Sequence, residues 1–130
     1  MNKSSLSEVQ LPSILIAEDD EDLREEIARR FVREGFCTYT AADGREAYTK
    51  FLLHKPDIII TDLRMPHLGG EEIVAYFSKF ESNPPLIIVI SGDMARLGEW
   101  RQHVAGVFEK PFKIEDVIAL VRAKFPAQSR

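Results

Sequence analysis

Five polar residues that together could carry out phosphate chemistry stand just after the ends of short apolar runs. They are Glu18, Asp19, Asp62, Ser91 and Lys110. Carboxylates that lie close together repel one another unless one takes up a proton or a cation compensates. Oxygen ligands without a cysteine suit Mg²⁺, which takes one or two carboxylates together with waters and phosphate oxygens. The residue types therefore predict a site for Mg²⁺ and a phosphoryl group.

Asp62 is the residue that we expect to react. With Mg²⁺ and the Lys110 ammonium lowering its affinity for protons, its carboxylate stays ionised near neutral pH and can attack phosphorus, which gives an acyl phosphate. Lys110 can pair with Asp62 or with a phosphate, and the Ser91 hydroxyl can donate a hydrogen bond to a phosphoryl oxygen. The predicted site thus holds a tetrahedral dianion.

The elements that must position these residues alternate between strands and helices. Continuous apolar runs rich in Ile and Val predict strands covered on both faces. The predicted strands are Ile14–Ala17, Phe36–Ala41, Asp57–Thr61, Leu86–Ile90 and Gly106–Phe108. Apolar residues at helical spacing predict helices around Leu23–Phe31 and over Gly44–Lys55, Glu71–Phe80 and Ile114–Phe125, with a weaker pattern in Asp93–Ala105.

This alternation predicts an α/β fold with right-handed crossovers. We expect a doubly wound sheet of five parallel strands with a short or irregular fourth helix, and ligands of such sheets bind outside the carboxyl ends of the strands. If the sheet has the flavodoxin-like strand order 2-1-3-4-5, the first and third strands are neighbours. Glu18, Asp19 and Asp62 would then share one pocket.

Composition narrows the class of protein. A chain of 130 residues fits one domain, which we place at residues 13–126 between tails at 1–12 and 127–130. The net charge of −4 argues against direct binding of nucleic acid. The single cysteine, the lack of an apolar run long enough to cross a bilayer and the polar N-terminal residues favour a cytoplasmic protein without membrane insertion.

The chain resembles the receiver domains of two-component response regulators, in particular single receivers of the chemotaxis type. Four segments carry the resemblance, each at a predicted strand end. They are ILIAEDD with Glu18-Asp19, IIITDLRMP with Asp62, VISG with Ser91 and EKPF with Lys110. Their order covers the chain from Ser13 to about Phe125.

The resemblance implies a signalling domain rather than an enzyme, one that promotes its own phosphorylation and dephosphorylation. Asp62 would accept a phosphoryl group from a phosphohistidine on a sensor histidine kinase or a histidine phosphotransfer protein. Asp19 and Asp62 would bind Mg²⁺ directly, Glu18 would act through water, and the Arg64 backbone carbonyl would complete the protein ligands. Ser91 and Lys110 would contact the phosphoryl oxygens, and the bond before Pro111 would be cis. Phosphorylation would change the surface offered to a downstream protein, and the resemblance allows a homodimer.

Three departures from the family pattern affect what can be carried over. The position three residues before Lys110, where many members have Tyr or Phe, is Val107, and the neighbouring Phe108 should point to the opposite face of the sheet. The stretch between Ser91 and Lys110 is short and contains Gly98. Gly69-Gly70 lacks the side-chain helix cap that many members have there.

Two other functions stay open at this stage. The chain could be a pseudo-receiver, a binding module that works without phosphorylation. Val107 and the short stretch between Ser91 and Lys110 would be compatible with such a module. It could also be a small Mg²⁺-dependent phosphatase that uses the same carboxylates on a separate substrate.

Overall fold

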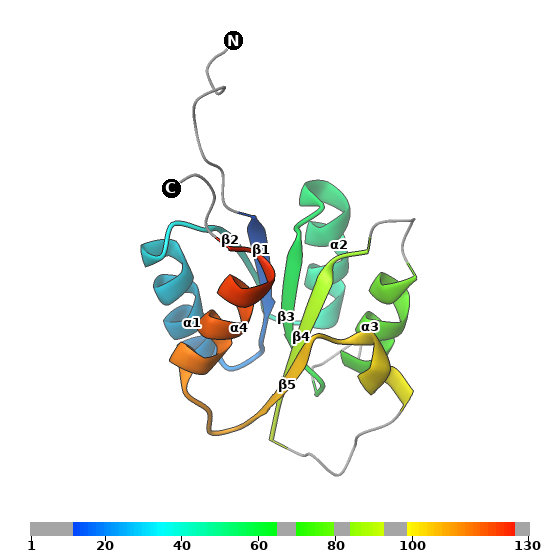
Figure 1. Ribbon diagram of the computed structural model, residues 1–130. Helices are drawn as coiled ribbons and strands as arrows, with labels where there is room; N and C mark the ends of the chain where they lie inside the picture. The colour runs from blue at the N-terminus through cyan, green and yellow to red at the C-terminus, as the bar shows by residue number, and fades with distance from the viewer. Residues whose placement is uncertain (1–11, 65–69, 80–83, 93–98, 127–130) are drawn as a thin grey trace.

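A five-stranded parallel sheet forms the centre of the computed structural model, which describes residues 12–64, 70–79, 84–92 and 99–126 (Figure 1). The strands are β1 (Ser13–Ala17), β2 (Cys37–Ala41), β3 (Ile58–Asp62), β4 (Leu86–Ser91) and β5 (Gly106–Glu109). Their order is β2-β1-β3-β4-β5, and every neighbouring pair is parallel. The predicted fold class and strand order are confirmed.

Helices cover both faces of the sheet, as Figure 1 shows. The helices are α1 (Glu21–Arg33), α2 (Gly44–His54), α3 (Gly70–Ser78) and α4 (Ile114–Lys124), with a 3₁₀ helix at Glu99–His103. Helices α1 and α4 lie on one face, and α2 and α3 lie on the other. The short 3₁₀ helix stands where a short or irregular fourth helix was expected, between β4 and β5; residues 93–98 of that segment lie outside the described residues.

The sheet residues alternate between two hydrophobic cores. Ile14 and Ile16 of β1 pack with α1 and α4, whereas Leu15 and Ala17 pack with α2 and α3. All four side chains are fully buried. This explains why the strands have continuous apolar sequences, since both of their faces are covered.

The first helix begins close to the acid pair for local reasons. The Asp20 side chain accepts a hydrogen bond of 3.2 Å from the Leu23 backbone N–H, which caps the helix. Its inner face buries Ile27 and Phe31. The helix ends before Gly35, which has a φ of 99° in the left-handed region that glycine adopts readily.

Two neighbouring residues of β5 show the alternation that the sequence predicted. Val107 packs against the core under α2 and α3, while Phe108 packs against the core under α1 and α4. Phe108 therefore does not take the place of an aromatic side chain at position 107. The sequence has Gly69-Gly70 where many family members have a capping side chain. Gly70 begins α3, and position 69 lies outside the described residues.

The ends of the predicted domain are only partly covered. Strand β1 begins at Ser13 and α4 ends at Lys124. The predicted tails at 1–12 and 127–130 fall outside the described residues, apart from Pro12, so the domain limits stay predictions. Among the described residues no helix has the length and apolar character needed to span a bilayer.

Two adjacent residues of α1 should differ sharply in their contribution to stability. Phe31 is fully buried with its ring centroid 5.4 Å from that of Phe36, whereas Val32 is 59% exposed. We expect Phe31→Ala to lower the free energy of unfolding by about 3–5 kcal/mol, the cost of a large core cavity. Val32→Ala should change it by less than about 0.5 kcal/mol. Urea unfolding at equilibrium measures both, and equal losses would contradict the packing described.

Candidate functional site

The carboxyl ends of β1, β3, β4 and β5 bring the predicted site residues to one edge of the sheet. Lys110 lies at the centre, with its Nζ 2.6 Å from Oδ2 of Asp62 and 2.9 Å from Oε1 of Glu18. Because these residues lie at the carboxyl ends of three different strands, parallel pairing is what brings them together. The structure thus brings together residues that are up to 92 positions apart in the sequence.

Glu18 is a fully buried carboxylate. Its Oε2 accepts a hydrogen bond of 2.9 Å from the Asp20 backbone N–H. Its Oε1 is close enough to Lys110 for an ion pair, but no group of the described residues donates it a hydrogen bond of good geometry. Burial raises the pKa of Glu18 to about 7, with the negative charge of Asp62 adding to the increase and the Asp20 and Lys110 contacts opposing it.

Lys110 is positioned by its backbone as well as by its charge. Its N–H donates a hydrogen bond of 2.8 Å to the carbonyl of Ser91, which ties the end of β5 to the end of β4. The peptide bond to Pro111 is cis, as the resemblance implied. Partial burial alone would lower the pKa of Lys110, but its hydrogen bond to Asp62, its close contact with Glu18 and the negative charges of both carboxylates together raise it above its ordinary value. The side chain is therefore held as an ammonium.

Asp62 ends β3 with both carboxylate oxygens engaged. Oδ2 accepts the bond from Lys110, and Oδ1 accepts one of 3.1 Å from the Arg64 backbone N–H. The carboxylate is almost fully buried, yet it lines a cavity of about 290 Å³ together with Arg64, Gly92 and Lys110. Asp62 is thus fixed in orientation and still open to a small ligand on one side.

Three carboxylates are close enough to share one cation. Glu18, Asp19 and Asp62 each offer an oxygen, and these oxygens lie within 4.8 Å of one another. Asp19 is exposed, unlike the other two, so the cluster opens to solvent at Asp19. One ammonium faces three acids, and the incompletely satisfied Oε1 of Glu18 adds to the excess of negative charge. The donor set and its charge fit a hard divalent cation such as Mg²⁺.

The remaining predicted residues lie at the same edge. Ser91 is buried at the end of β4, beside Lys110. Arg64 is exposed and lines the cavity over Asp62. The predicted contacts of the Ser91 hydroxyl with a phosphoryl group, and of the Arg64 carbonyl with a metal, remain predictions.

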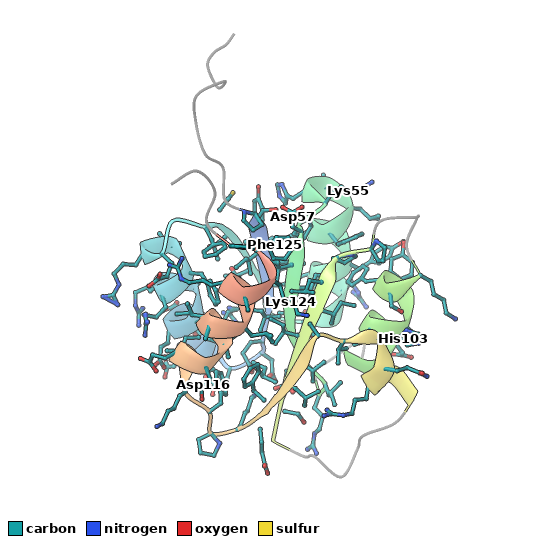
Figure 2. The ribbon with its side chains drawn as sticks, in the orientation of Figure 1. Lys55, Asp57, His103, Asp116, Lys124 and Phe125 are labelled. Carbon is teal, nitrogen blue, oxygen red and sulfur yellow. The ribbon has the colours of Figure 1, made fainter. Side chains whose placement is uncertain are left out.

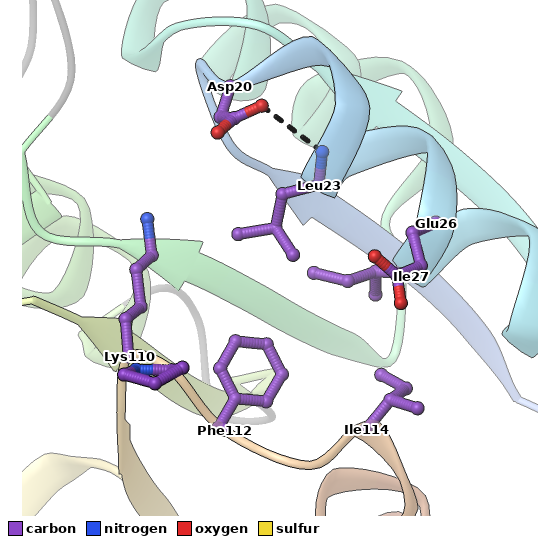
Figure 3. A pocket seen from close by; sticks show the side chains of 8 residues that line it. Asp20, Leu23, Glu26, Ile27, Lys110, Phe112 and Ile114 are labelled. Atoms are coloured by element: carbon purple, nitrogen blue, oxygen red, sulfur yellow. Dashed lines mark hydrogen bonds between the residues drawn. The ribbon is translucent and has the colours of Figure 1, made fainter.

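A second cavity adjoins the site and was missed by the sequence reasoning. It has a volume of about 470 Å³ and lies between the start of α1 and the segment after β5. Figure 3 shows Leu23 and Ile27 on one side and Phe112 and Ile114 on the other, with Lys110 at one end. We call this cavity the α1 groove. The apolar residues at 112 and 114, directly after Lys110-Pro111, were the signal that could have indicated it.

Comparisons with known proteins agree with this geometry. The sequence model of the "Response regulator receiver domain" family matches residues 14–122. The response regulator ArlR of Staphylococcus aureus is 32% identical over 120 residues, which are 87% of this chain and 52% of ArlR.

Solved structures give the same fold. The receiver domain of Francisella response regulator 1452 superposes with a TM-score of 0.77 at 28% identity, covering 86% of this chain and 94% of that one. TrrA of Thermotoga maritima, a response regulator solved in complex with Mg²⁺-BeF, superposes with a TM-score of 0.78 at 24% identity, covering 87% and 98%.

The α/β sheet with an acid cluster and a lysine at the carboxyl ends of its strands is the fold and site of a receiver-type signalling domain. The match to the family model identifies the family. The chain belongs to the family of response regulator receiver domains, which are signalling domains of two-component systems. It spans about half the length of the curated relatives that it matches.

Glu18 should make the stability of the metal-free domain depend on pH. Its pKa is about 7 in the fold and 4.5 in an ordinary glutamate, so the folded state binds more protons and loses stability as the pH rises through this window. We expect the free energy of unfolding to fall on the order of 1–3 kcal/mol between about pH 5 and about pH 8. Glu18→Gln, which does not titrate, should lose less over the same range.

Urea unfolding in the presence of EDTA tests this dependence. The raised pKa of Lys110 lies above the window, because its ordinary value is already 10.5. Glu26→Gln, at an exposed position of α1, is the matched control and should keep the wild-type slope. Identical slopes for wild type and Glu18→Gln would contradict the assignment.

Proposed function

We propose that residues 13–126 form a phosphoaccepting receiver domain that takes a phosphoryl group from a phosphohistidine onto Asp62 and thereby changes its interaction surface. The observation that carries the proposal is the Lys110 ammonium held between Asp62 and Glu18, within a cluster of three carboxylates. Such a set neutralises the charge that builds up when a carboxylate and a phosphoryl group approach each other.

Asp62 is the nucleophile in this proposal. One of its carboxylate oxygens forms a bond to phosphorus while the bond between phosphorus and the donor's imidazole nitrogen breaks, and the imidazole leaves with the electron pair. The Arg64 N–H on Oδ1 and the Lys110 ammonium on Oδ2 fix the direction from which the carboxylate attacks. Hydrolysis of the acyl phosphate by water would later regenerate the carboxylate.

Asp19 and Asp62 would hold Mg²⁺ directly, with Glu18 acting through water and the Arg64 carbonyl as a further ligand. When bound, this ion supplies positive charge to the phosphoryl oxygens. Lys110 and the Ser91 hydroxyl would contact the other oxygens of the transferred group. The cavity over Asp62 has room for such a group, since its volume of about 290 Å³ exceeds that of several water molecules.

The α1 groove suits the protein that brings the phosphohistidine. It is lined mainly by apolar side chains, and Lys110 lines both the groove and the cavity over Asp62. A helix of a histidine kinase or histidine phosphotransfer protein that packs on Leu23 and Phe112 would hold its histidine beside the acceptor. The domain would then share the cytoplasm with its kinase.

Phosphorylation of Asp62 is testable with a small phosphodonor. With Mg²⁺ and acetyl phosphate, intact-mass measurement should show wild-type protein gaining about 80 Da, the mass of one phosphoryl group on a carboxylate. Asp62→Asn should gain nothing, because its amide cannot attack phosphorus. Asp116→Asn is the matched control: this exposed aspartate lies on the first turn of α4 (Figure 2) and should label as wild type does.

Two results would overturn the proposal. Wild-type protein without an adduct would favour the pseudo-receiver, whose partner binding would be indifferent to Asp62→Asn. Hydrolysis of many phosphomonoester molecules by each protein molecule would favour the phosphatase instead.

A further inference from the structure

Arg24 on α1 makes a contact with the acid pair that the proposed mechanism does not use. This half-buried residue donates a hydrogen bond of 2.8 Å from Nη1 to the backbone carbonyl of Glu18. That carbonyl belongs to the planar peptide group that joins Glu18 to Asp19. The guanidinium of Arg24 therefore binds the peptide from which the Asp19 side chain projects.

Three backbone groups of this turn are held by other contacts. The Glu18 N–H donates to the carbonyl of Ala41 over 3.0 Å, and the Asp20 N–H donates to Glu18 Oε2 over 2.9 Å. The Asp20 carbonyl accepts from the Arg24 N–H over 2.8 Å, as part of the first turn of α1. Between these points lies the Glu18 carbonyl, and the Arg24 side chain holds it.

We propose that Arg24 is a positioning residue for the cation: by fixing the peptide between Glu18 and Asp19, it keeps the Asp19 carboxylate directed at Glu18 and Asp62. This inference rests on the proposed function, in which a divalent cation at these three carboxylates is required for phosphoryl transfer. Asp19 depends on such a contact more than its neighbours, because it is the exposed member of the cluster and is not held by burial.

The charge of Arg24 and its hydrogen bond have opposite effects on cation binding. A guanidinium near the cluster repels a divalent cation, so removal of the charge alone would tighten binding. Loss of the hydrogen bond frees the peptide and also leaves a carbonyl of a buried residue without this partner, which weakens binding. The direction of the change in affinity therefore separates the two effects.

Manganese binding to Arg24→Met provides the test. The electron paramagnetic resonance signal of free Mn²⁺ gives the dissociation constant of Mn²⁺ directly. Competition between Mn²⁺ and Mg²⁺ gives the dissociation constant of Mg²⁺. We expect both constants to rise about 10-fold or more, as for the loss of groups that orient metal ligands. Arg29→Met is the matched control: Arg29 lies on the same helix, is 71% exposed and pairs only loosely with Glu25 at 4.0 Å. It should bind Mn²⁺ within about 2-fold of wild type.

Affinity of Arg24→Met equal to or tighter than that of wild type would overturn the proposal, even if urea unfolding showed that the variant is less stable. If Arg24→Met does not fold, Arg24→Lys decides. It keeps the charge but lacks the planar fork and the reach of the guanidinium, so we expect Mn²⁺ binding about 3-fold weaker or more. An unchanged affinity in a folded Arg24→Lys would then overturn the proposal.

The same preparations distinguish this inference from the proposed function. Wild-type protein that gains no phosphoryl group from acetyl phosphate and Mg²⁺ would defeat the proposed function itself. Wild-type protein that does gain it, alongside an Arg24→Met variant with wild-type affinity for Mn²⁺, would defeat the positioning role alone.

Discussion

The contact of one lysine ammonium with two buried carboxylates is the interaction on which the site depends. Burying Glu18 and Asp62 side by side would cost several kcal/mol for each charge without a partner. Lys110 supplies that partner at 2.6 Å and 2.9 Å. Lys110 does not fully compensate the burial of Glu18, since burial still raises the pKa of Glu18 to about 7. The cluster therefore has a residual attraction for a second positive charge, and Asp19 provides the side from which one can enter.

The parallel sheet gives this arrangement its precision. Asp62 and Ser91 end strands, and the other site residues directly follow strands; the register places Ala17 opposite Thr61 and Ser91 opposite Glu109. The other edge of the sheet is built differently, since Asp57 before β3 accepts a hydrogen bond of 3.0 Å from the Ser13 N–H and so ties two strand starts together (Figure 2). Asp57 and Asp62 are five positions apart and both acidic. Their positions at opposite ends of β3 give them different environments.

Much of this arrangement could be predicted from the sequence, because strand ends in a parallel sheet converge whatever the side chains are. Once the strand order is given, the gathering of Glu18, Asp19, Asp62 and Lys110 follows from that rule. The second contact of Lys110, with Glu18, was not predicted, since it depends on how a long side chain crosses between strands. Arg24 was also missed: in the sequence it is one of several charges on α1, and only the bend of the chain at Asp19 brings the Glu18 carbonyl within its reach. Contacts from flexible side chains to the backbone leave no periodic pattern to detect.

Position 107, which is Val in this chain, bears on how a change at Asp62 would be passed on in the proposed function. Its apolar side chain, like that of Val104, packs against the core under α2 and α3. The end of β5 is nevertheless linked to the site through Lys110, whose N–H binds Ser91 and whose ammonium binds Asp62. Lys110 also lines the α1 groove together with Phe112. Under the proposed function, a phosphoryl group on Asp62 that drew the ammonium away from Glu18 would act through Lys110 on the side of the sheet covered by α1 and α4, where Phe108 packs.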